Sequence, residues 1–270
     1  MKTRMHFISG LPRSGSTLLA GILRQNPRFH AAMTSPVGAL FNTLVEAMSP
    51  GNEFAVFISE EQRKDLLEGL FTTYYRKESH KDVIFDTNRM WCARLSALTR
   101  IFPEAKVICC VRSVAWIMDS IERLVRRNAF EHTRLFANAS ERGTMYTRIE
   151  TLARHDRMVG FAWSALREAS YGEHAGCLHF VEYESFTRDP EKTLARIYAL
   201  LEEEPYSHDF DNVVYEEPEF DRSIGVEGLH KVSRKVAFKP RETILPPDLF
   251  KKYDRLSFWK ENKESSPKAS

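Results

Sequence analysis

The chain has 270 residues, 43% of them hydrophobic, which is enough for one sizeable α/β domain with a buried core. Its formal charge of only +2 argues against bulk binding of nucleic acid. The four cysteines show neither a disulfide framework nor zinc-ligand spacing, and no apolar run reaches membrane-spanning length. An apolar strand pattern begins within a few residues of Met1 and leaves no room for a signal peptide, so we expect a cytoplasmic protein without a membrane partner.

The N-terminal stretch has the pattern of a strand, a small-residue turn and a helix. Met5–Ile8 form a short apolar run, a Gly/Pro/Ser turn follows, and Leu18–Leu23 show helical spacing that stops before Pro27. This arrangement points backbone N–H groups and the positive end of a helix dipole at one spot. It predicts an anion-binding site at the start of the chain.

The residues of this turn follow the spacing of a nucleotide-phosphate loop with one exception. Gly10, Gly15 and Thr17 stand at the expected positions, but Ser16 replaces the lysine that nucleotide triphosphatases place on the β- and γ-phosphates. Arg13 supplies a cation inside the turn, and its forked guanidinium suits a phosphate or a sulfate. The loop is therefore predicted to bind such a group without the apparatus for splitting a triphosphate.

The next segment combines loop, helix and one buried strand. Residues 28–58 are expected to be loop with a short helix around 37–48, forming one wall of the ligand pocket. Ser59–Gln62 is a capping-box signature, which predicts a helix to about residue 78. Val83–Phe85 is a short apolar run typical of a buried strand, and Asp86–Arg89 follow its carboxyl end, where open α/β sheets bind ligands. A helix over about 91–101 comes next.

The clearest core strand lies in the middle of the chain, over residues 105–111, and includes the adjacent Cys109 and Cys110. Side chains of neighbouring strand residues point to opposite faces, so these two cysteines are expected to pack as small apolar groups. Arg112 follows the strand directly, and a helix with apolar residues at spacings of three and four begins after Ser113. Ser120 lies nearly two turns along this helix, away from its apolar stripe.

The remaining elements complete the pattern of a central sheet flanked by helices. After a loop or lid at 138–143 we predict a long helix ending near Tyr171, a strand over 178–183 and a helix from Asp189-Pro190 to about 201. A basic, non-periodic run at 228–235 precedes a terminal helix over 245–259. The sequence thus predicts one α/β domain over residues 1–260 of the phosphate-loop type, with a mostly parallel central sheet, and a disordered tail at 261–270.

Leu11–Leu19 resembles the 5′-phosphosulfate loop of sulfotransferases that use 3′-phosphoadenosine 5′-phosphosulfate (PAPS). The similarity is greatest to tyrosylprotein sulfotransferases and their bacterial relatives. The resemblance implies that the loop binds the cofactor through Arg13, Ser14, Gly15, Ser16, Thr17 and Leu18.

Three further segments resemble the same family. Arg112 and Ser120 reproduce the strand-end arginine, and the serine eight residues later, that bind the 3′-phosphate. The string from Tyr183 to Leu194 resembles a segment whose tyrosine lies beside the adenine. Lys231 and Ser233 match a C-terminal loop that closes over the cofactor phosphates.

The family resemblance implies an enzyme that moves a sulfuryl group from PAPS to an acceptor hydroxyl and releases 3′,5′-bisphosphoadenosine (PAP), without a metal. The acceptor would be a peptide, with tyrosine as one candidate, a carbohydrate or a small molecule, and a homodimer is left open. Two alternatives are a phosphate-loop kinase, against which the missing lysine counts, and a nucleotide-binding protein without catalysis.

The proton acceptor is not fixed by the resemblance, because the sequence departs from both family patterns at the positions that supply it. We expect Asp86 to be the base, with Arg13 holding the phosphosulfate and Arg89 as the cation on the leaving oxygen. His30 and Glu46, on the expected pocket wall, are the alternatives for the base.

Overall fold

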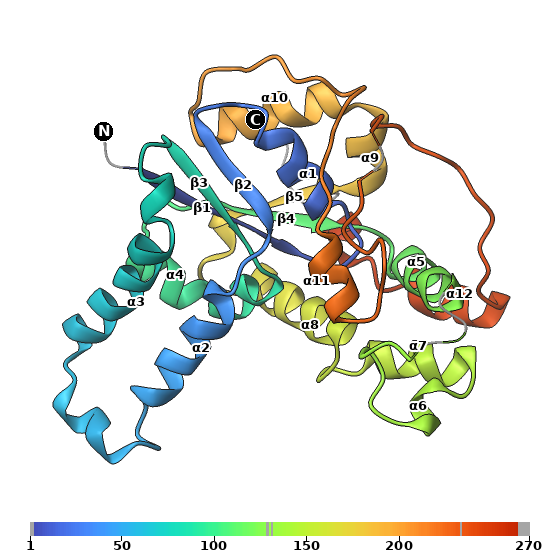
Figure 1. Ribbon diagram of the computed structural model, residues 1–270, viewed down its shortest axis with the longest axis horizontal. Coiled ribbons are helices and arrows are strands. Elements are labelled where there is room, and N and C mark those ends of the chain that lie inside the picture. The colour runs from blue at the N-terminus through green and yellow to red at the C-terminus, as the bar shows by residue number, and fades with distance from the viewer. Residues whose placement is uncertain (1–2, 128–129, 131, 233, 264–270) are drawn as a thin grey trace.

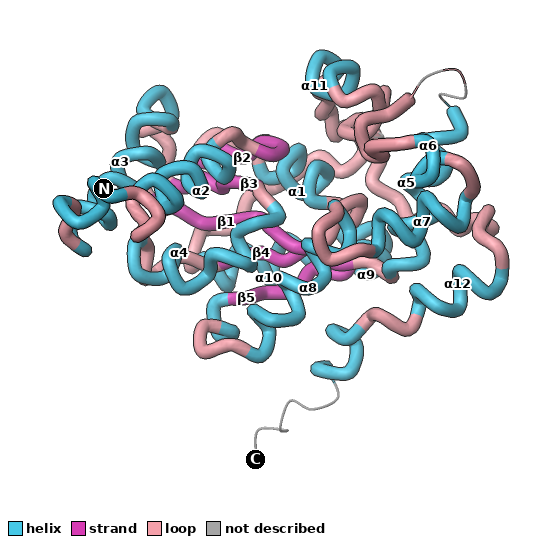
Figure 2. Tube along the Cα trace, turned by 90° about the horizontal axis from the view of Figure 1, so that it is seen from below, coloured by secondary structure: helices cyan, strands magenta, loops and turns pink. Residues whose placement is uncertain are grey.

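Five parallel strands form one sheet at the centre of the protein, in the order β2-β3-β1-β4-β5. The computed structural model describes residues 3–127, 130, 132–232 and 234–263 (Figure 1). The strands are β1 (Arg4–Gly10), β2 (Phe29–Thr34), β3 (Val83–Thr87), β4 (Val107–Val111) and β5 (Leu178–Glu182). Figure 2 shows them in this order through the middle of the molecule. The predicted α/β class is therefore confirmed, and the sheet is parallel throughout.

Helices cover both faces of the sheet. One face is covered by α1 (Ser16–Leu23) and α10 (Pro190–Leu201), and the other mainly by α4 (Leu95–Ile101), α5 (Val114–Arg127) and α8 (Met158–Tyr171) (Figure 1). The other helices are α2 (Val37–Ala47), α3 (Glu60–Tyr74), α6 (Ala139–Arg142), α7 (Met145–Ala153), α9 (Tyr183–Arg188), α11 (Pro218–Ser223) and α12 (Pro247–Asp254). Short 3₁₀ turns are η1 (Glu53–Phe57), η2 (Arg76–Glu78), η3 (Arg89–Arg94), η4 (Ala175–Cys177) and η5 (Phe258–Lys263).

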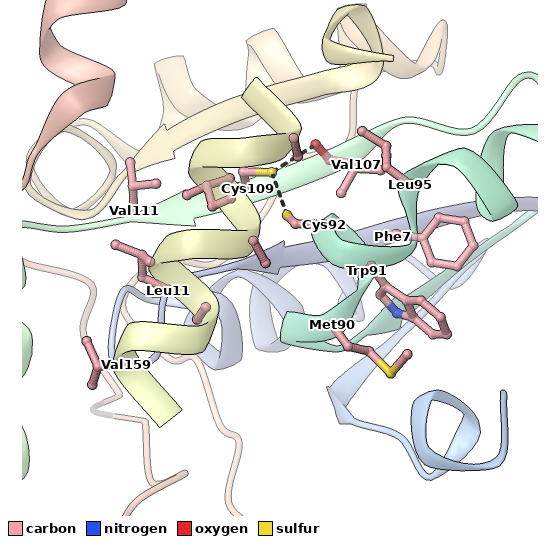
Figure 3. Packing of buried hydrophobic residues seen from close by; sticks show 14 of the residues in the cluster. Phe7, Leu11, Met90, Trp91, Cys92, Leu95, Val107, Cys109, Val111 and Val159 are labelled. Atoms are coloured by element: carbon pink, nitrogen blue, oxygen red, sulfur yellow. Dashed lines mark hydrogen bonds between the residues drawn. The ribbon is translucent and has the colours of Figure 1, made fainter. Parts of the chain in front are cut away.

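Strand alternation divides the core into two clusters, one on each face of the sheet. Phe7 and Cys109 pack into the larger cluster with Trp91, whereas Ile8 and Cys110 pack into the smaller one against α1 and α10. Figure 3 shows the larger cluster, where Cys109 lies beside Cys92 with their sulfur atoms 3.8 Å apart. The prediction that Cys109 and Cys110 pack as apolar groups on opposite faces is confirmed.

Several elements differ from the sequence-based prediction. The loop expected at 138–143 contains helix α6, and the helix expected over about 91–101 begins as the 3₁₀ turn η3 before α4. Residues 29–34, expected as loop, form the edge strand β2, in which only alternate side chains are buried. The capping box at Ser59 is present, but α3 ends at Tyr74 and a 3₁₀ turn occupies 76–78. The long helix expected to end near Tyr171 is two helices, α7 and α8, because the backbone is extended at Arg154 and Arg157.

The C-terminal part of the chain continues past the expected helix. The 3₁₀ turn η5 reaches Lys263, so it extends into the tail predicted at 261–270, and residues 264–270 lie outside the described part of the chain. Among the described residues, no helix has both the length and the apolar character needed to cross a bilayer.

Candidate functional site

A cavity of about 640 Å³ lies at the edge of the sheet where the parallel strands end. Its lining includes residues that follow β1, β3, β4 and β5, and residues from the segments 220–232 and 235–241. A parallel sheet places all its carboxyl ends on one edge, so segments far apart in sequence meet here. A cavity of this size can enclose most of a nucleotide-sized ligand.

The turn after β1 contains two glycines with positive φ, a conformation that favours glycine. Gly10 has φ 101°, and a β-carbon there would lie 2.2 Å from the carbonyl oxygen of Cys110 on β4. Gly15 has φ 96° and is the N-cap of α1, but it provides no side-chain cap. The backbone N–H groups of the first turn of α1 are therefore free of a side-chain cap and available to an anion.

Arg13 connects this turn with helix α5. Its Nε donates a hydrogen bond to Ser120 Oγ at 3.2 Å, and its Nη1 donates to the carbonyl oxygen of Leu229. Burial lowers the pKa of the Arg13 guanidinium from 12.5 to about 10, a value at which it still carries its charge at neutral pH. The loop arginine and the helix serine, assigned to separate motifs from the sequence, thus lie side by side.

Arg112, at the end of β4, is held in a fixed orientation beside the same cavity. Its Nε donates to Glu184 Oε1 at 3.0 Å, and its guanidinium lies over the Tyr183 ring at 4.1 Å from the centroid. The Tyr183 ring in turn packs against the turn after β1, since a β-carbon on Gly15 would lie 2.9 Å from Tyr183 Cδ2. Arg112, Tyr183 and Gly15 therefore form one packed wall of the cavity.

Arg89, at the start of η3, is a further cation that lines the cavity. Its side chain is exposed, and no hydrogen bond or ion pair joins its guanidinium to another residue in the described part of the chain. The surrounding protein nevertheless lowers the pKa of this guanidinium through desolvation, as expected for a group that reaches solvent only through a cavity. Its backbone is fixed where its carbonyl oxygen accepts a hydrogen bond from Ser9 Oγ at 3.2 Å.

The charge of the lining has one sign. Eight cationic side chains contribute to it: Arg13, Arg89, Arg112, Arg134, Lys231, Lys235, Lys239 and Arg241. No aspartate or glutamate is among the described residues that line the cavity. Some of these cations also have carboxylate partners outside the lining; for example, Arg241 lies 2.6 Å from Asp119. Such a cavity favours a ligand with several negative charges.

Asp86, the base expected from the sequence, does not line this cavity. Its carboxylate is fully buried and accepts hydrogen bonds from Ser35 Oγ and Tyr75 Oη, both at 2.6 Å, and from Trp91 Nε1 at 2.8 Å. Burial raises the pKa of this carboxyl group, against the effect of its three donors. Neighbouring side chains of a strand point to opposite faces of the sheet. Asp86 therefore points into the larger core cluster, where it meets Trp91, whereas Thr87 lines the cavity.

The two alternative bases also lie away from the lining. His30 is on edge strand β2 with its Nδ1 3.6 Å from Glu78 Oε2, and Glu46 is exposed on α2. Neither residue contributes to the cavity. Ser14 is likewise fully buried, with its Oγ 2.8 Å from the carbonyl oxygen of Cys110, so only its backbone could contact a ligand.

The other residues predicted from the sequence meet at the cavity: Arg13, Gly15, Ser16, Thr17, Leu18, Arg89, Arg112, Ser120, Tyr183 and Lys231. Lys231 is mostly exposed, with its Nζ 3.8 Å from Glu216. Ser233 lies outside the described residues. Sequence reasoning assigned no role to His230 or Arg241, although the basic run at 228–235 contains His230. Over the described part of the chain, no group of three or more histidine, cysteine, aspartate or glutamate side chains could hold a metal ion.

The fold and the cavity define an α/β protein with an arginine-rich anion site at the carboxyl edge of a parallel sheet. Residues 6–208 match the sulfotransferase family, which is three quarters of the chain, and the protein belongs to that family. No curated protein sequence matches it.

Several solved sulfotransferase structures share the fold at low sequence identity. The sulfotransferase domain of the Synechococcus PCC 7002 olefin synthase is 17% identical, with a TM-score of 0.51, and the alignment covers 94% of this chain and 95% of that one. A sulfotransferase from Alicyclobacillus acidocaldarius is 15% identical, with a TM-score of 0.52 and coverages of 83% and 90%. Mouse sulfotransferase SULT7A1, solved with PAP, is 15% identical, with a TM-score of 0.50 and coverages of 96% and 85%.

Proposed function

We propose that this sulfotransferase uses PAPS as the donor, transfers its sulfuryl group to an acceptor hydroxyl and releases PAP. The observation that carries the proposal is the convergence of Arg13 and Arg112, from the ends of two different strands, on one cavity. The hydrogen bond from Arg13 to Ser120 supports it, because it joins the two segments expected to bind opposite ends of one nucleotide. PAPS carries a phosphosulfate and a separate 3′-phosphate, so it needs two groups of cations.

The proposed roles follow the positions of the residues around the cavity. The uncapped first turn of α1, with Gly15, Ser16, Thr17 and Leu18, binds the 5′-phosphosulfate together with Arg13. Arg112 and Ser120 bind the 3′-phosphate, and Tyr183 lies beside the adenine with Arg112 stacked on one face of its ring. Lys231 closes the cavity over the phosphates from the C-terminal segment.

Sulfuryl transfer depends mainly on positioning the reactants and stabilising charge. Negative charge develops on the oxygen that bridges sulfur and the 5′-phosphate, and a cation near that oxygen stabilises the transition state. We assign this role to Arg89, whose guanidinium has no competing partner among the described residues. With a guanidinium charge in this position, the reaction can proceed without a metal ion.

We propose a phenolic hydroxyl, such as that of tyrosine in a peptide, as the acceptor. Met33, Leu135, Met158 and Phe220 add apolar surface to the cavity beside the cations. This surface supports an aromatic acceptor over a fully polar carbohydrate, because an aromatic ring gains from apolar burial. Small-molecule phenols fit the same description.

Two measurements test the donor and the reaction. Titration calorimetry should show that PAP binds more tightly than ATP, and that magnesium does not improve PAP binding. Equal or tighter binding of ATP with magnesium would instead favour a kinase-type phosphotransferase. The second measurement is transfer of labelled sulfate from PAPS to a panel of tyrosine peptides, phenols and sugars. Tight PAP binding without transfer to any acceptor would support the non-catalytic alternative.

A further inference from the structure

An aspartate–histidine pair lies at the cavity and has no role in the account given so far. Asp221 is on α11 and is 2% exposed. Its Oδ1 lies 2.6 Å from His230 Nδ1, and its Oδ2 accepts a hydrogen bond from the backbone N–H of His230 at 2.9 Å. One buried carboxylate therefore fixes both the ring and the backbone of His230.

This contact determines which nitrogen of His230 carries its proton. A carboxylate oxygen only accepts hydrogen bonds, so Nδ1 must be the protonated nitrogen that donates to Asp221. Nε2 then carries a lone pair, and among the residues that the structure describes the ring forms a hydrogen bond only with Asp221, through Nδ1. Because His230 lines the cavity, this unprotonated nitrogen is available to a ligand there.

The charged groups around His230 come from three elements. Asp221 on α11 favours the protonated imidazole, whereas Arg13 on the β1–α1 turn and Arg89 on η3 disfavour it. Burial is the largest effect, and the net result is a pKa for His230 below its ordinary value of 6.5. The imidazole is therefore neutral at neutral pH and able to take up a proton. It also lies near Arg13, proposed to hold the phosphosulfate, and near Arg89, proposed to stabilise the leaving oxygen.

We propose that His230 Nε2 is the proton acceptor for the acceptor hydroxyl and that Asp221 is its positioning residue. This assignment rests on the proposed function and supplies the base that neither Asp86, His30 nor Glu46 can provide from its position. It also agrees with the absence of carboxylates among the described lining residues.

The step balances without any further reactant. The hydroxyl proton of the acceptor moves to His230 Nε2 while the acceptor oxygen forms a bond to sulfur. The bond between sulfur and the bridging oxygen breaks, and its electron pair stays on that oxygen, which leaves as part of PAP. The imidazolium later gives its proton to water.

Two phenols of different acidity test the assignment directly. At mildly alkaline pH 4-nitrophenol is already ionised and needs no base, whereas phenol, with a pKa of about 10 like tyrosine, must lose a proton. We expect His230→Ala to slow transfer to phenol by about 100-fold or more, and transfer to 4-nitrophenol by less than about 10-fold. PAP affinity, measured by calorimetry, should be unchanged. The matched control is His155→Ala, at an exposed histidine outside the cavity.

Asp221→Asn tests the positioning role by its pH profile. Loss of the carboxylate should shift the acidic limb of the rate of transfer to phenol to lower pH and reduce the plateau about 10-fold or more, with PAP affinity retained. A residue that merely supported the fold would lower stability and leave the position of the limb unchanged. If His230→Ala does not fold, His230→Gln, which keeps a polar side chain, takes its place. It should show the same slowing of transfer to phenol.

The possible failures are distinguishable. Equal slowing of transfer to both phenols, or slowing of transfer to neither, overturns the assignment of His230 as the proton acceptor but leaves the proposed function standing. Failure of the wild-type protein to bind PAP overturns the proposed function, and the assignment with it. If the wild-type protein binds PAP but uses neither phenol, an NMR titration of the His230 ring decides the matter. Bound PAP should raise the imidazole pKa, and an unchanged value would remove His230 from the site.

Discussion

Arg13 and Ser120 are 107 residues apart in sequence, yet Nε of the arginine donates a hydrogen bond to the serine hydroxyl at 3.2 Å. The arginine belongs to the turn after β1, and the serine to helix α5 after β4. These strands are neighbours in the sheet, so the turn and the helix emerge side by side. The two predicted anion-binding segments therefore form one continuous surface, and a change in one segment should affect ligand binding at the other.

Arg112→Ala should weaken PAP binding by about 2–3 kcal/mol, or roughly 30- to 160-fold in Kd. The variant loses a forked, charged donor and leaves Glu184 without its partner beside the ligand, where its charge repels the 3′-phosphate. Arg112→Lys keeps the positive charge but loses the forked pair of donors. Its PAP affinity should therefore lie between those of the wild type and Arg112→Ala. Calorimetry with PAP measures all three proteins.

The matched control for Arg112 is Arg100→Ala. Arg100 also forms an ion pair, with Glu60 at 3.0 Å, but both side chains are more than three quarters exposed and lie on the protein surface. Such pairs contribute about 0–1 kcal/mol, so PAP binding should be unchanged and stability nearly so. An Arg112→Ala protein with wild-type affinity would remove Arg112 from the binding site.

Gly15→Ala should reduce both stability and PAP affinity. The φ of 96° is unfavourable for alanine, by about 1–3 kcal/mol, and the added β-carbon would collide with the ring of Tyr183. Displacing that ring disturbs Arg112, which stacks on it, so we expect at least a tenfold loss in PAP affinity. Gly69→Ala is the control, because Gly69 lies within α3 with no atom near its added β-carbon. It should stabilise the protein by up to about 1 kcal/mol, and thermal unfolding of both variants checks the contrast.

Arg89→Ala should lower the rate of sulfuryl transfer by roughly 100-fold with little change in stability. Its guanidinium has no partner among the described residues, so its removal breaks no contact within the fold. The effect should fall on kcat more than on PAP affinity, because the charge that Arg89 stabilises develops during transfer. Single-turnover rates with a phenolic acceptor measure it. An unchanged rate would rule out Arg89 as the cation on the leaving oxygen.

Asp86→Asn distinguishes a structural carboxylate from a base. The amide keeps the size of the side chain and can still bond to its three neighbours, so transfer and PAP binding should stay within about threefold of wild type. Asp86→Ala should instead destabilise the fold by about 3–5 kcal/mol, since it leaves the donors of Tyr75 and Trp91 without an acceptor. A loss of transfer in a stably folded Asp86→Asn protein would restore Asp86 as the base.

Asp86 should also affect how stability depends on pH. Burial raises its pKa in the folded protein above the ordinary value of 3.8, so the folded state binds more protons between those two values. The free energy of unfolding should therefore fall as pH rises through that window. Asp86→Asn removes the titrating group and should flatten this part of the curve, which chemical denaturation at a series of pH values can measure.

Local patterns predicted most of the sheet and the two segments that meet at the cavity, because each lay within a short, distinctive stretch of sequence. Apolar runs identified β1, β3, β4 and β5, and the ligand-facing turns followed them directly. β2 was missed because an edge strand buries only alternate side chains, so Phe29–Thr34 has no continuous apolar run. The break between α7 and α8 was missed because apolar spacing continues on both sides of it.

The residues that we propose for proton transfer could not be predicted in the same way. Adjacent residues of a strand point to opposite faces of the sheet, so a single position decides whether a side chain lies in the core or at the cavity. The sequence does not show which face of β3 borders the cavity. That is why, within the stretch Asp86–Arg89, a catalytic role was expected for Asp86, which lies in the core, and no role was assigned to Thr87, which lines the cavity. The Asp221–His230 pair depends on a turn that brings residues nine positions apart into contact, a relationship that no periodic pattern indicates.

His6 gives a stability prediction that is independent of the cavity. It is buried on β1, its Nδ1 accepts a hydrogen bond from the backbone N–H of Lys106 at 3.0 Å, and burial with nearby Arg4 lowers its pKa from 6.5 to about 4. The unfolded chain therefore binds more protons than the folded one between pH 4 and 6.5. The free energy of unfolding should fall by about 3 kcal/mol as the pH drops through this window.

His6→Asn separates this effect from other acid-sensitive groups. Asparagine can still accept the Lys106 hydrogen bond but does not titrate, so the difference between wild-type and variant stabilities should change with pH only between about 4 and 6.5. His155→Asn, at an exposed position between α7 and α8, should leave the wild-type curve unchanged. Parallel curves for the wild type and His6→Asn would mean that His6 is protonated equally in both states. The hydrogen bond to Lys106 would then not hold its ring neutral within the sheet.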